Sequence, residues 1–241
     1  MSEPARIALF GAAGKMGREI LRQAWRHDDL DIALAYDTKH AGEIVESTTV
    51  LTLPSALPED VRLVIDFSSA TAVQDHLDLA LDARAAFLCG VTGLPQEILN
   101  ELRAAANEIP VLHSPNMAAG MQVMFKIAAL TARALPNYER HILEIHHTEK
   151  KDAPSGSALR LSDAVRDAIE EDTPITSLRM GDVTGEHRIT FGGPGERIEI
   201  IHHADSRAVF AVGALRAACW LLHKSPGFYT MADVLELNDE R

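Results

Sequence analysis

Short apolar runs recur through the first half of the chain, and each one ends in small or polar residues. The runs occupy residues 6–10, 31–36, 63–67, 86–90 and 109–113. Nearly continuous apolar runs of this length are typical of strands that are buried on both faces of a parallel sheet. Stretches that favour helices lie between them, at residues 15–25, 70–81 and 96–106. This alternation predicts an α/β fold with a Rossmann-like, doubly wound parallel sheet.

The pattern changes after Gly120, where the repeat of strand and helix stops. Residues 121–135 predict a long apolar helix. Its Val123, Ile127 and Leu130 recur at helical spacing and therefore share one face.

The segment that follows is rich in strand patterns. Strand-like stretches occupy residues 142–147, 178–180, 188–191 and 196–201, and a helix starts near Ser155. The last stretch alternates polar and apolar residues, as a half-solvated antiparallel strand does. The glycine-rich turn at 192–195 predicts a hairpin. We therefore expect a smaller α+β domain with a mixed sheet.

These patterns predict two domains. Residues 1–118 and 207–241 form the expected dinucleotide-binding domain, because an apolar helix over 212–222 returns the chain to the first sheet. Residues 119–206 form the expected substrate-holding domain. A chain of 241 residues with 46% hydrophobic content is long enough to bury two modest cores.

A glycine-rich turn directly follows the first predicted strand. Gly11 allows a tight turn, Gly14 lets the backbone approach a pyrophosphate, and Gly17 permits close packing of the next helix on the sheet. The spacing is GxxGxxG rather than the common GxGxxG, and a glycine triplet alone is a weak signal. Its position between an apolar strand and a helix favours a dinucleotide site. The alternative is a doubly wound domain that binds no nucleotide.

Asp37 ends the second predicted strand, 20 positions beyond Gly17. An acidic side chain at this place accepts hydrogen bonds from the adenosine ribose hydroxyls, which favours NADH over NADPH. Thr38 and Lys39 follow it, and a hydroxyl with an ammonium group could instead hold a 2′-phosphate. Both cofactors therefore stay open.

Two imidazoles, an ammonium group and a small-residue turn are concentrated in residues 144–157. Adjacent strand residues point to opposite faces, so His146 and His147 meet one ligand only where the chain turns. Lys150 lies in the polar run that supplies this turn, and a helix begins near Ser155. A helix N-terminus favours a carboxylate or phosphate. The segment predicts a site for an anionic small molecule, and a solvated loop is the alternative.

Composition and charge argue against several classes of function. The formal net charge is −12 and no basic run is present, so we expect no nucleic acid as a partner. No apolar run approaches a membrane span and the N-terminus has no signal pattern, so we expect a cytoplasmic protein without membrane contact. Cys89 and Cys219 form no CxxC pair, and His141 with the following pair lacks the spacing of a metal site. We therefore expect no bound metal.

The run His146–Ser157, HHTEKKDAPSGS, resembles the signature of the 4-hydroxy-tetrahydrodipicolinate reductases, also called dihydrodipicolinate reductases. The glycine turn and residues 90–93, 114–120 and 196–215 resemble the same family, so the resemblance covers nearly the whole chain. It implies reduction of a small cyclic dicarboxylate imine by NADH or NADPH in lysine and diaminopimelate biosynthesis. It also implies a homotetramer, with oligomer contacts made by the substrate domain.

The resemblance assigns roles to single positions. It makes His146 the proton donor and Lys150 the second catalytic residue, and it implies that His147, Gly156 and Ser157 bind the substrate carboxylates. The positions that it assigns to the cofactor are Gly11, Ala13, Gly14, Lys15, Met16, Gly17, Asp37, Phe67, Gly90, Thr92, Asn116 and Met117.

The chain departs from the family pattern at two places. Ser157 stands where the family often has threonine, and it keeps the hydroxyl. Residues 173–187 are fewer than in many members, in a region that contributes to subunit packing in the family.

Two other classes of protein compete with the reductase. A nucleotide-sensing regulatory module would keep the first domain without catalysis, but His146, Lys150 and Gly156 together argue against it. A dehydrogenase acting on a semialdehyde needs a thiol nucleophile, and Cys89 lies at the end of a core strand instead.

Overall fold

The computed structural model describes residues 3–238. The chain divides into two compact units, with borders after Met117 and after Val209. The first unit contains the chain up to Met117 and again from Phe210, and the second unit is Ala118–Val209. The second unit is thus inserted into the sequence of the first.

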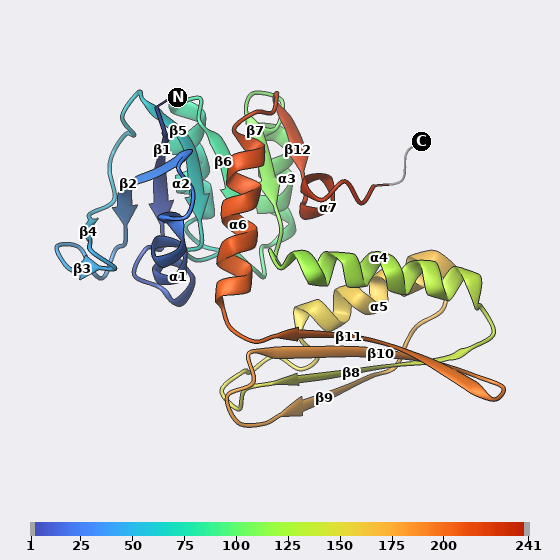
Figure 1. The fold of residues 1–241 in the computed structure, drawn as a ribbon. Coiled ribbons are helices and arrows are strands. Elements are labelled where there is room, and N and C mark those ends of the chain that lie inside the picture. The colour runs from blue at the N-terminus through green and yellow to red at the C-terminus, as the bar shows by residue number, and fades with distance from the viewer. Residues whose placement is uncertain (1–2, 239–241) are drawn as a thin grey trace. The chain divides into compact units, whose positions relative to one another are not determined.

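The first unit is built around one largely parallel sheet (Figure 1). Within residues 3–238 its strands lie in the order β12-β7-β6-β5-β1-β2-β4-β3. The strands are β1 (Ala5–Phe10), β2 (Leu30–Tyr36), β3 (Ile44–Val45), β4 (Thr48–Leu51), β5 (Val61–Asp66), β6 (Ala86–Cys89), β7 (Pro110–His113) and β12 (Gly227–Tyr229). Neighbours pair in parallel, except β3 and β4. The chain moves outward from β1 in both directions, as in a doubly wound fold.

Helices cover both faces of this sheet. They are α1 (Lys15–Ala24), α2 (Val73–Asp82), α3 (Gln96–Ala105), α6 (Ala208–Leu221) and α7 (Met231–Val234). Ile7 and Leu9 of β1 belong to a core that includes apolar residues of α1 and α6. Ala8 and Phe10 point the other way, into a core with α2 and α3. Because both faces are buried, the strands are apolar on both sides, which explains the continuous runs in the sequence.

The second unit is a mixed sheet with two helices on one face (Figure 1). Its elements are α4 (Ala119–Ala134), β8 (Glu139–His146), α5 (Gly156–Ile169), β9 (Ile175–Arg179), β10 (Gly185–Gly193) and β11 (Glu196–Ala204). The strand order is β11-β10-β8-β9, with β10 antiparallel to both neighbours and β8 parallel to β9. Gly193 pairs with Glu196, so the turn between them closes a hairpin as predicted.

The face of α4 that carries the apolar stripe seen in the sequence is not the face that the helix buries. Val123, Ile127 and Leu130 do share a face, but this face is exposed, at 38%, 43% and 58%. The helix instead buries a neighbouring stripe that includes Met124 and Phe125. Apolar residues occupy more than half of the circumference of this helix, so the pattern alone could not select the buried side.

The predicted fold class is confirmed: a doubly wound parallel sheet is followed by a smaller α+β unit with a mixed sheet. The predicted helices and long strands are present, with ends that shift by a few residues. The sequence pattern does not predict the short strands β3, β4 and β12 or the single-turn helix α7.

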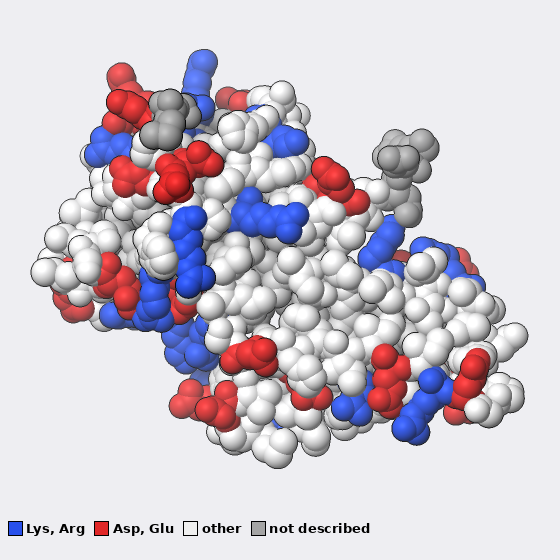
Figure 2. Space-filling model, viewed as in Figure 1, with Lys and Arg blue, Asp and Glu red and all other residues white. Residues whose placement is uncertain are grey.

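The described surface carries charge of both signs. On the face drawn in Figure 2, basic and acidic side chains are interspersed. Among residues 3–238, no helix has both the length and the apolar character needed to cross a membrane.

Candidate active site

The glycine turn lies at the carboxyl end of β1 and is held by close backbone contacts. Gly11 has φ +77°, and a Cβ there would lie 2.7 Å from the carbonyl oxygen of Phe67. At Gly17 a Cβ would lie 2.2 Å from the Gly11 oxygen. Only glycine fits at these two positions, because the turn, the first helix and the loop after β5 meet there without space for a side chain.

A cavity of about 290 Å³ opens beside this turn. Gly11, Ala13, Gly14, Asp37 and Phe67, all of them predicted cofactor residues, contribute to its lining together with Thr38, Lys39, His40, Ser68 and others. Asp37 accepts a hydrogen bond of 2.9 Å from the backbone N–H of Lys39, which fixes the turn after β2. Bare backbone from the glycine turn and an acidic side chain in one cavity fit the phosphates and ribose of a dinucleotide.

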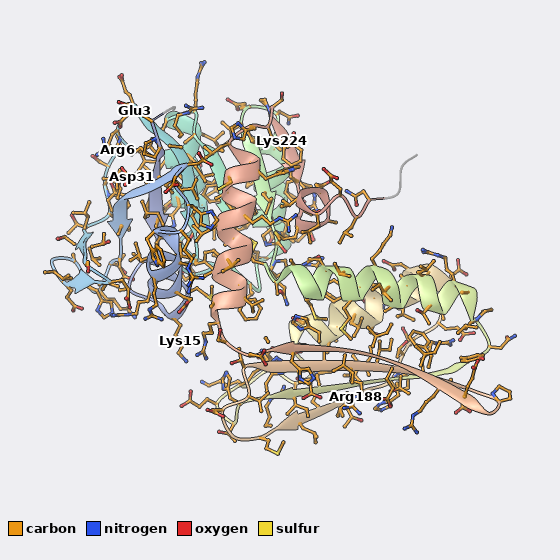
Figure 3. All side chains as sticks on the ribbon, in the orientation of Figure 1. Glu3, Arg6, Lys15, Asp31, Arg188 and Lys224 are labelled. Carbon is orange, nitrogen blue, oxygen red and sulfur yellow. The ribbon has the colours of Figure 1, made fainter. Side chains whose placement is uncertain are left out.

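Other predicted cofactor residues lie outside this lining and contribute in different ways. Met16 packs against the core, and Lys15 extends from the start of α1 (Figure 3). In the same view Arg6 and Asp31 mark the amino ends of β1 and β2. Lys15 lies at the opposite end of the sheet. The glycine turn therefore occupies the carboxyl edge of the strands, where doubly wound sheets bind ligands.

Phe67 connects the cavity with the loop after β6. Its ring fills the space beside Gly90, where a Cβ would lie 2.2 Å from the ring. Thr92 in the same loop is exposed. Asn116 and Met117 are buried at the border of the unit, and the Ser114 hydroxyl donates to the Asn116 carbonyl at 2.7 Å.

In the second unit, His146 ends β8 and is buried, with 7% of its surface exposed. Its Nδ1 contacts Oε2 of Glu144, which is fully buried two residues earlier on the same face of the strand. A Cβ at Gly185 on the neighbouring strand would lie 3.1 Å from Nε2 of His146. Glycine has no Cβ, so this position does not crowd the second nitrogen of His146.

The surroundings of His146 favour its neutral form. Burial lowers the pKa of His146 below its ordinary value, and the positive charges of Lys150 and Arg179 lower it further. Glu144 acts in the opposite direction. The balance changes when negative charge enters, because an anionic ligand nearby favours the protonated imidazole.

Arg179, the last residue of β9, holds the loop that carries Lys150. Its guanidinium donates to the backbone oxygens of Lys150 and Asp152 and, at 2.9 Å, to Oε1 of Glu144. Lys150 itself pairs with Asp152 at 2.9 Å between Nζ and Oδ1. Two cationic groups are thus fixed at the loop that follows the histidine pair: Lys150 within the loop and Arg179 from β9.

The helix α5 begins beside this loop. Ser155 is its N-cap, and the Ser155 hydroxyl accepts a hydrogen bond from the Ala158 N–H at 3.2 Å. Gly156 and Ser157 form the first turn, and Gly156 is exposed, with open space where a Cβ would stand. His147 lies just past the end of β8 and is half-buried. The first-turn N–H groups and the helix dipole favour an anion at this end of α5.

His187 is a buried histidine that the local sequence pattern does not reveal. Its Nε2 lies 3.2 Å from the Ser155 hydroxyl, and its ring packs edge-on against His146 with 5.1 Å between centroids. Burial lowers the pKa of His187 to about 3, so this imidazole is neutral at physiological pH. Its neighbour across the hairpin, His202, is half-buried against Gly120, and His203 faces the opposite side.

Strand register explains how these residues come together. Ser177, Glu144, His187 and His202 occupy one row across β9, β8, β10 and β11. The signal for Glu144 was present in the sequence, since residues two apart on a strand share a face. Arg179 and His187 come from distant strands, and only the pairing of those strands brings them to His146.

Other candidate chemistry receives no support. Among residues 3–238, no group of three or more His, Cys, Asp or Glu side chains could hold a metal ion. Burial raises the pKa of the Cys89 thiol to about 12, so the thiolate required of a nucleophile is scarce at neutral pH.

The fold and the site define a class of protein. A parallel sheet with a glycine turn and an acidic residue after its second strand is a Rossmann-type dinucleotide-binding architecture. The inserted unit adds a buried histidine–carboxylate pair next to cationic groups and a helix N-terminus.

Comparison with known proteins gives the family. Residues 5–117 match the profile described as Dihydrodipicolinate reductase, N-terminus, and residues 120–235 match Dihydrodipicolinate reductase, C-terminus. The chain belongs to the dihydrodipicolinate reductase family.

Individual relatives agree with this. The chain is 35% identical to 4-hydroxy-tetrahydrodipicolinate reductase of Aquifex aeolicus (strain VF5), over 96% of this chain and 99% of that protein. It is 38% identical to the protein of that name from Anaeromyxobacter dehalogenans (strain 2CP-C), over 96% and 98%. Among solved structures, dipicolinate-bound dihydrodipicolinate reductase from Paenisporosarcina sp. TG-14 has a TM-score of 0.79 at 22% identity and covers 95% of this chain and 98% of its own. This likeness shows a shared fold.

Proposed function

We propose that this chain reduces 4-hydroxy-tetrahydrodipicolinate to tetrahydrodipicolinate with NADH or NADPH, in lysine and diaminopimelate biosynthesis. The observation that carries the proposal is the buried His146, paired with Glu144 and placed beside the Lys150 loop and the start of α5. The family membership of both halves of the chain supports the same activity.

The first unit supplies the residues that would hold the nicotinamide cofactor. The glycine turn, from Gly11 to Gly17, would receive the pyrophosphate on its backbone, and Asp37 would accept from the adenosine ribose. Phe67, Gly90, Thr92 and the Asn116–Met117 pair would line the nicotinamide side. When bound, the cofactor supplies the hydride.

In the second unit, His146 would supply the proton. It is mostly neutral near pH 7 without ligand, because burial lowers its pKa. A dicarboxylate carries two negative charges, and bound nearby it would raise this pKa and favour the imidazolium that a proton donor requires. Substrate binding would thus favour protonation of His146, the proposed proton donor.

The remaining cationic and N–H groups would hold the substrate. Lys150 would act as the second catalytic residue by neutralising carboxylate charge, and His147, Gly156 and Ser157 would orient the ring. The first turn of α5 favours an anion by its orientation, and the Arg179 contacts keep the Lys150 loop in place.

For the cofactor we favour NADH, because the Asp37 carboxylate would repel a 2′-phosphate in the same cavity. Thr38, Lys39 and His40 also line the cavity and could accommodate that phosphate, so use of NADPH as a second cofactor is part of the proposal.

We also propose a cytoplasmic homotetramer. The helices cover one face of the mixed sheet, and the opposite face carries apolar side chains that include Leu178 and Ile201, exposed by 43% and 41%. Exposed apolar positions on a sheet face are suited to burial between subunits.

The test is oxidation of NADH and, separately, NADPH by the purified protein, with substrate formed in place from pyruvate and aspartate semialdehyde by the preceding synthase. We expect His146→Gln to lower kcat roughly 10²–10⁴-fold, the usual contribution of general acid catalysis, with a much smaller change in KM. Cofactor binding without turnover by the unaltered protein would contradict the proposal and favour a regulatory role. Unchanged kcat in His146→Gln would refute the proton-donor assignment alone.

A further inference from the structure

Glu144 is a carboxylate with no exposed surface in the middle of a sheet. Each of its oxygens is engaged. Oε2 contacts Nδ1 of His146, and Oε1 accepts from the Ser155 backbone N–H at 3.2 Å and from the Arg179 guanidinium at 2.9 Å. Burial of a carboxylate costs free energy unless charged or hydrogen-bonding partners compensate for it. A group of this kind at a candidate active site suggests a functional role.

The carboxylate is ionised in this setting. Burial by itself raises the pKa of Glu144, but hydrogen bonds from Arg179, Ser177 and His146 outweigh it and bring the pKa below its ordinary value. An ionised carboxylate can only accept hydrogen bonds. The proton shared with His146 therefore belongs to Nδ1 of the imidazole.

We propose that Glu144 is a positioning residue for His146: it fixes the imidazole in the Nδ1–H tautomer and directs Nε2 toward the backbone of Gly185. This rests on the proposed role of His146 as proton donor. The hydrogen bond on one ring nitrogen determines what the other can do. With Nδ1–H held by Glu144, Nε2 is the nitrogen that takes up and releases the catalytic proton.

Glu144 also links the proton donor to the substrate-binding segment. Its Oε1 holds the N-cap residue of α5 and, through Arg179, the backbone of Lys150 and Asp152. One carboxylate thus orients the acid and the two anion-binding groups of the second unit.

Several charged or titratable groups lie near His146 and affect its pKa. They are Glu144 on its own strand, Lys150 in the following loop, Arg179 on β9 and His187 on β10. Only Glu144 among them carries negative charge. Removing that charge lowers the affinity of His146 for a proton.

The experiment combines ¹⁵N NMR of the histidine rings with steady-state kinetics. In the unaltered protein, with His146 assigned by the loss of its signals in His146→Gln, the neutral ring should show Nδ1 protonated and Nε2 free. In Glu144→Gln the amide can donate to Nδ1, so the proton should move to Nε2 and the pKa of His146 should fall. We expect kcat to fall roughly 10–100-fold, part of the roughly 10²–10⁴-fold effect of a general acid, with KM changed less than about threefold.

Glu186→Gln is the matched control. Glu186 lies on β10 next to His187 but points to the opposite face, where it pairs with His203 at 3.3 Å and with Arg188 at 3.8 Å (Arg188 is labelled in Figure 3). This variant removes one carboxylate from the same sheet and should leave the tautomer and pKa of His146 unchanged. Glu144→Asp keeps the charge beside Arg179 but shortens the reach to Nδ1, so it should be intermediate in both readouts.

The outcomes separate the alternatives. An Nε2–H tautomer of His146 in the unaltered protein overturns the proposal directly, whether or not any Glu144 variant folds. A folded Glu144→Gln with unchanged tautomer, pKa and kcat overturns it too and leaves Glu144 a purely structural role. Because the NMR measurement needs no turnover, failure of the proposed reductase activity is detected independently of failure of this inference.

Discussion

Substitution of Gly11 by alanine tests how the glycine turn is held. At this position the backbone has φ +77°, and a Cβ would lie 2.7 and 2.8 Å from backbone atoms of Phe67 and 2.9 Å from Cα of Ser68. Two costs are expected. The left-handed conformation costs an L-residue about 1–2 kcal/mol. The clash with backbone, which cannot rotate away as a side chain would, adds an overpacking cost of about 1–3 kcal/mol.

Gly42→Ala separates these two costs. Gly42 lies in the same unit and has φ +87°, but nothing lies within 4 Å of its Cβ position. Gly42→Ala should therefore lower the free energy of unfolding only by the conformational cost. The difference between the variants, about 1–3 kcal/mol, corresponds to an extra fall in melting temperature of roughly 2–12 °C for a unit of this size.

The assay is thermal unfolding followed by tryptophan fluorescence. Trp25 and Trp220 both lie in the first unit, so the signal reports that unit. Gly11 also lines the cavity proposed for the dinucleotide, and displacement of its turn should weaken NADH binding, whereas Gly42→Ala should leave binding unchanged. Equal melting temperatures for the two variants would refute the reasoning from the close contact.

Two further predictions concern pH and the cofactor. The folded pKa of His187, about 3, lies below its unfolded value of about 6.5, so its contribution to stability is complete above pH 6.5 and is lost as pH falls toward 3. This contribution to the free energy of unfolding amounts to about 2 kcal/mol between pH 7.5 and pH 5. His187→Gln should remove that part of the pH dependence of stability, measured by hydrogen exchange of β10 amides. An unchanged pH dependence in the variant would contradict the prediction. Asp37→Asn should weaken NADH roughly 10–100-fold in a fluorescence titration, as expected for loss of a charged hydrogen-bond acceptor, and NADPH less. Equal losses for both cofactors would show that Asp37 does not discriminate between them.

The fold of the first unit could be predicted because its central strands are buried on both faces. Runs such as 63–67 and 86–90 have no other common explanation when helical stretches separate them. The strands that the pattern does not predict, β4 and β12 among them, have only four and three residues, and their existence depends on pairing with a neighbour already in place. β6 also has only four residues, but all four are buried, whereas β4 and β12 are mostly half-buried and lack a continuous buried apolar run.

The site was predictable only in its local part. Residues 146–157 predict an anion site by their own composition. The partners of His146 follow different rules: Glu144 shares its strand, whereas Arg179 and His187 reach it through the register of β9 and β10. Register is set by tertiary packing, so no local pattern of the sequence encodes these contacts.

The insertion of the second unit into the first has a consequence for synthesis on the ribosome. When Val209 leaves the exit tunnel, every strand of the inserted unit has been made, and that unit can fold. The first unit cannot be completed then, because Ala211, Ala214, Leu215 and Leu221 of α6 fill one of its two cores and β12 extends its sheet beyond β7. Of the two units, the one that is begun first is therefore completed last, and one face of its sheet is only partly covered, by α1, until α6 has been made.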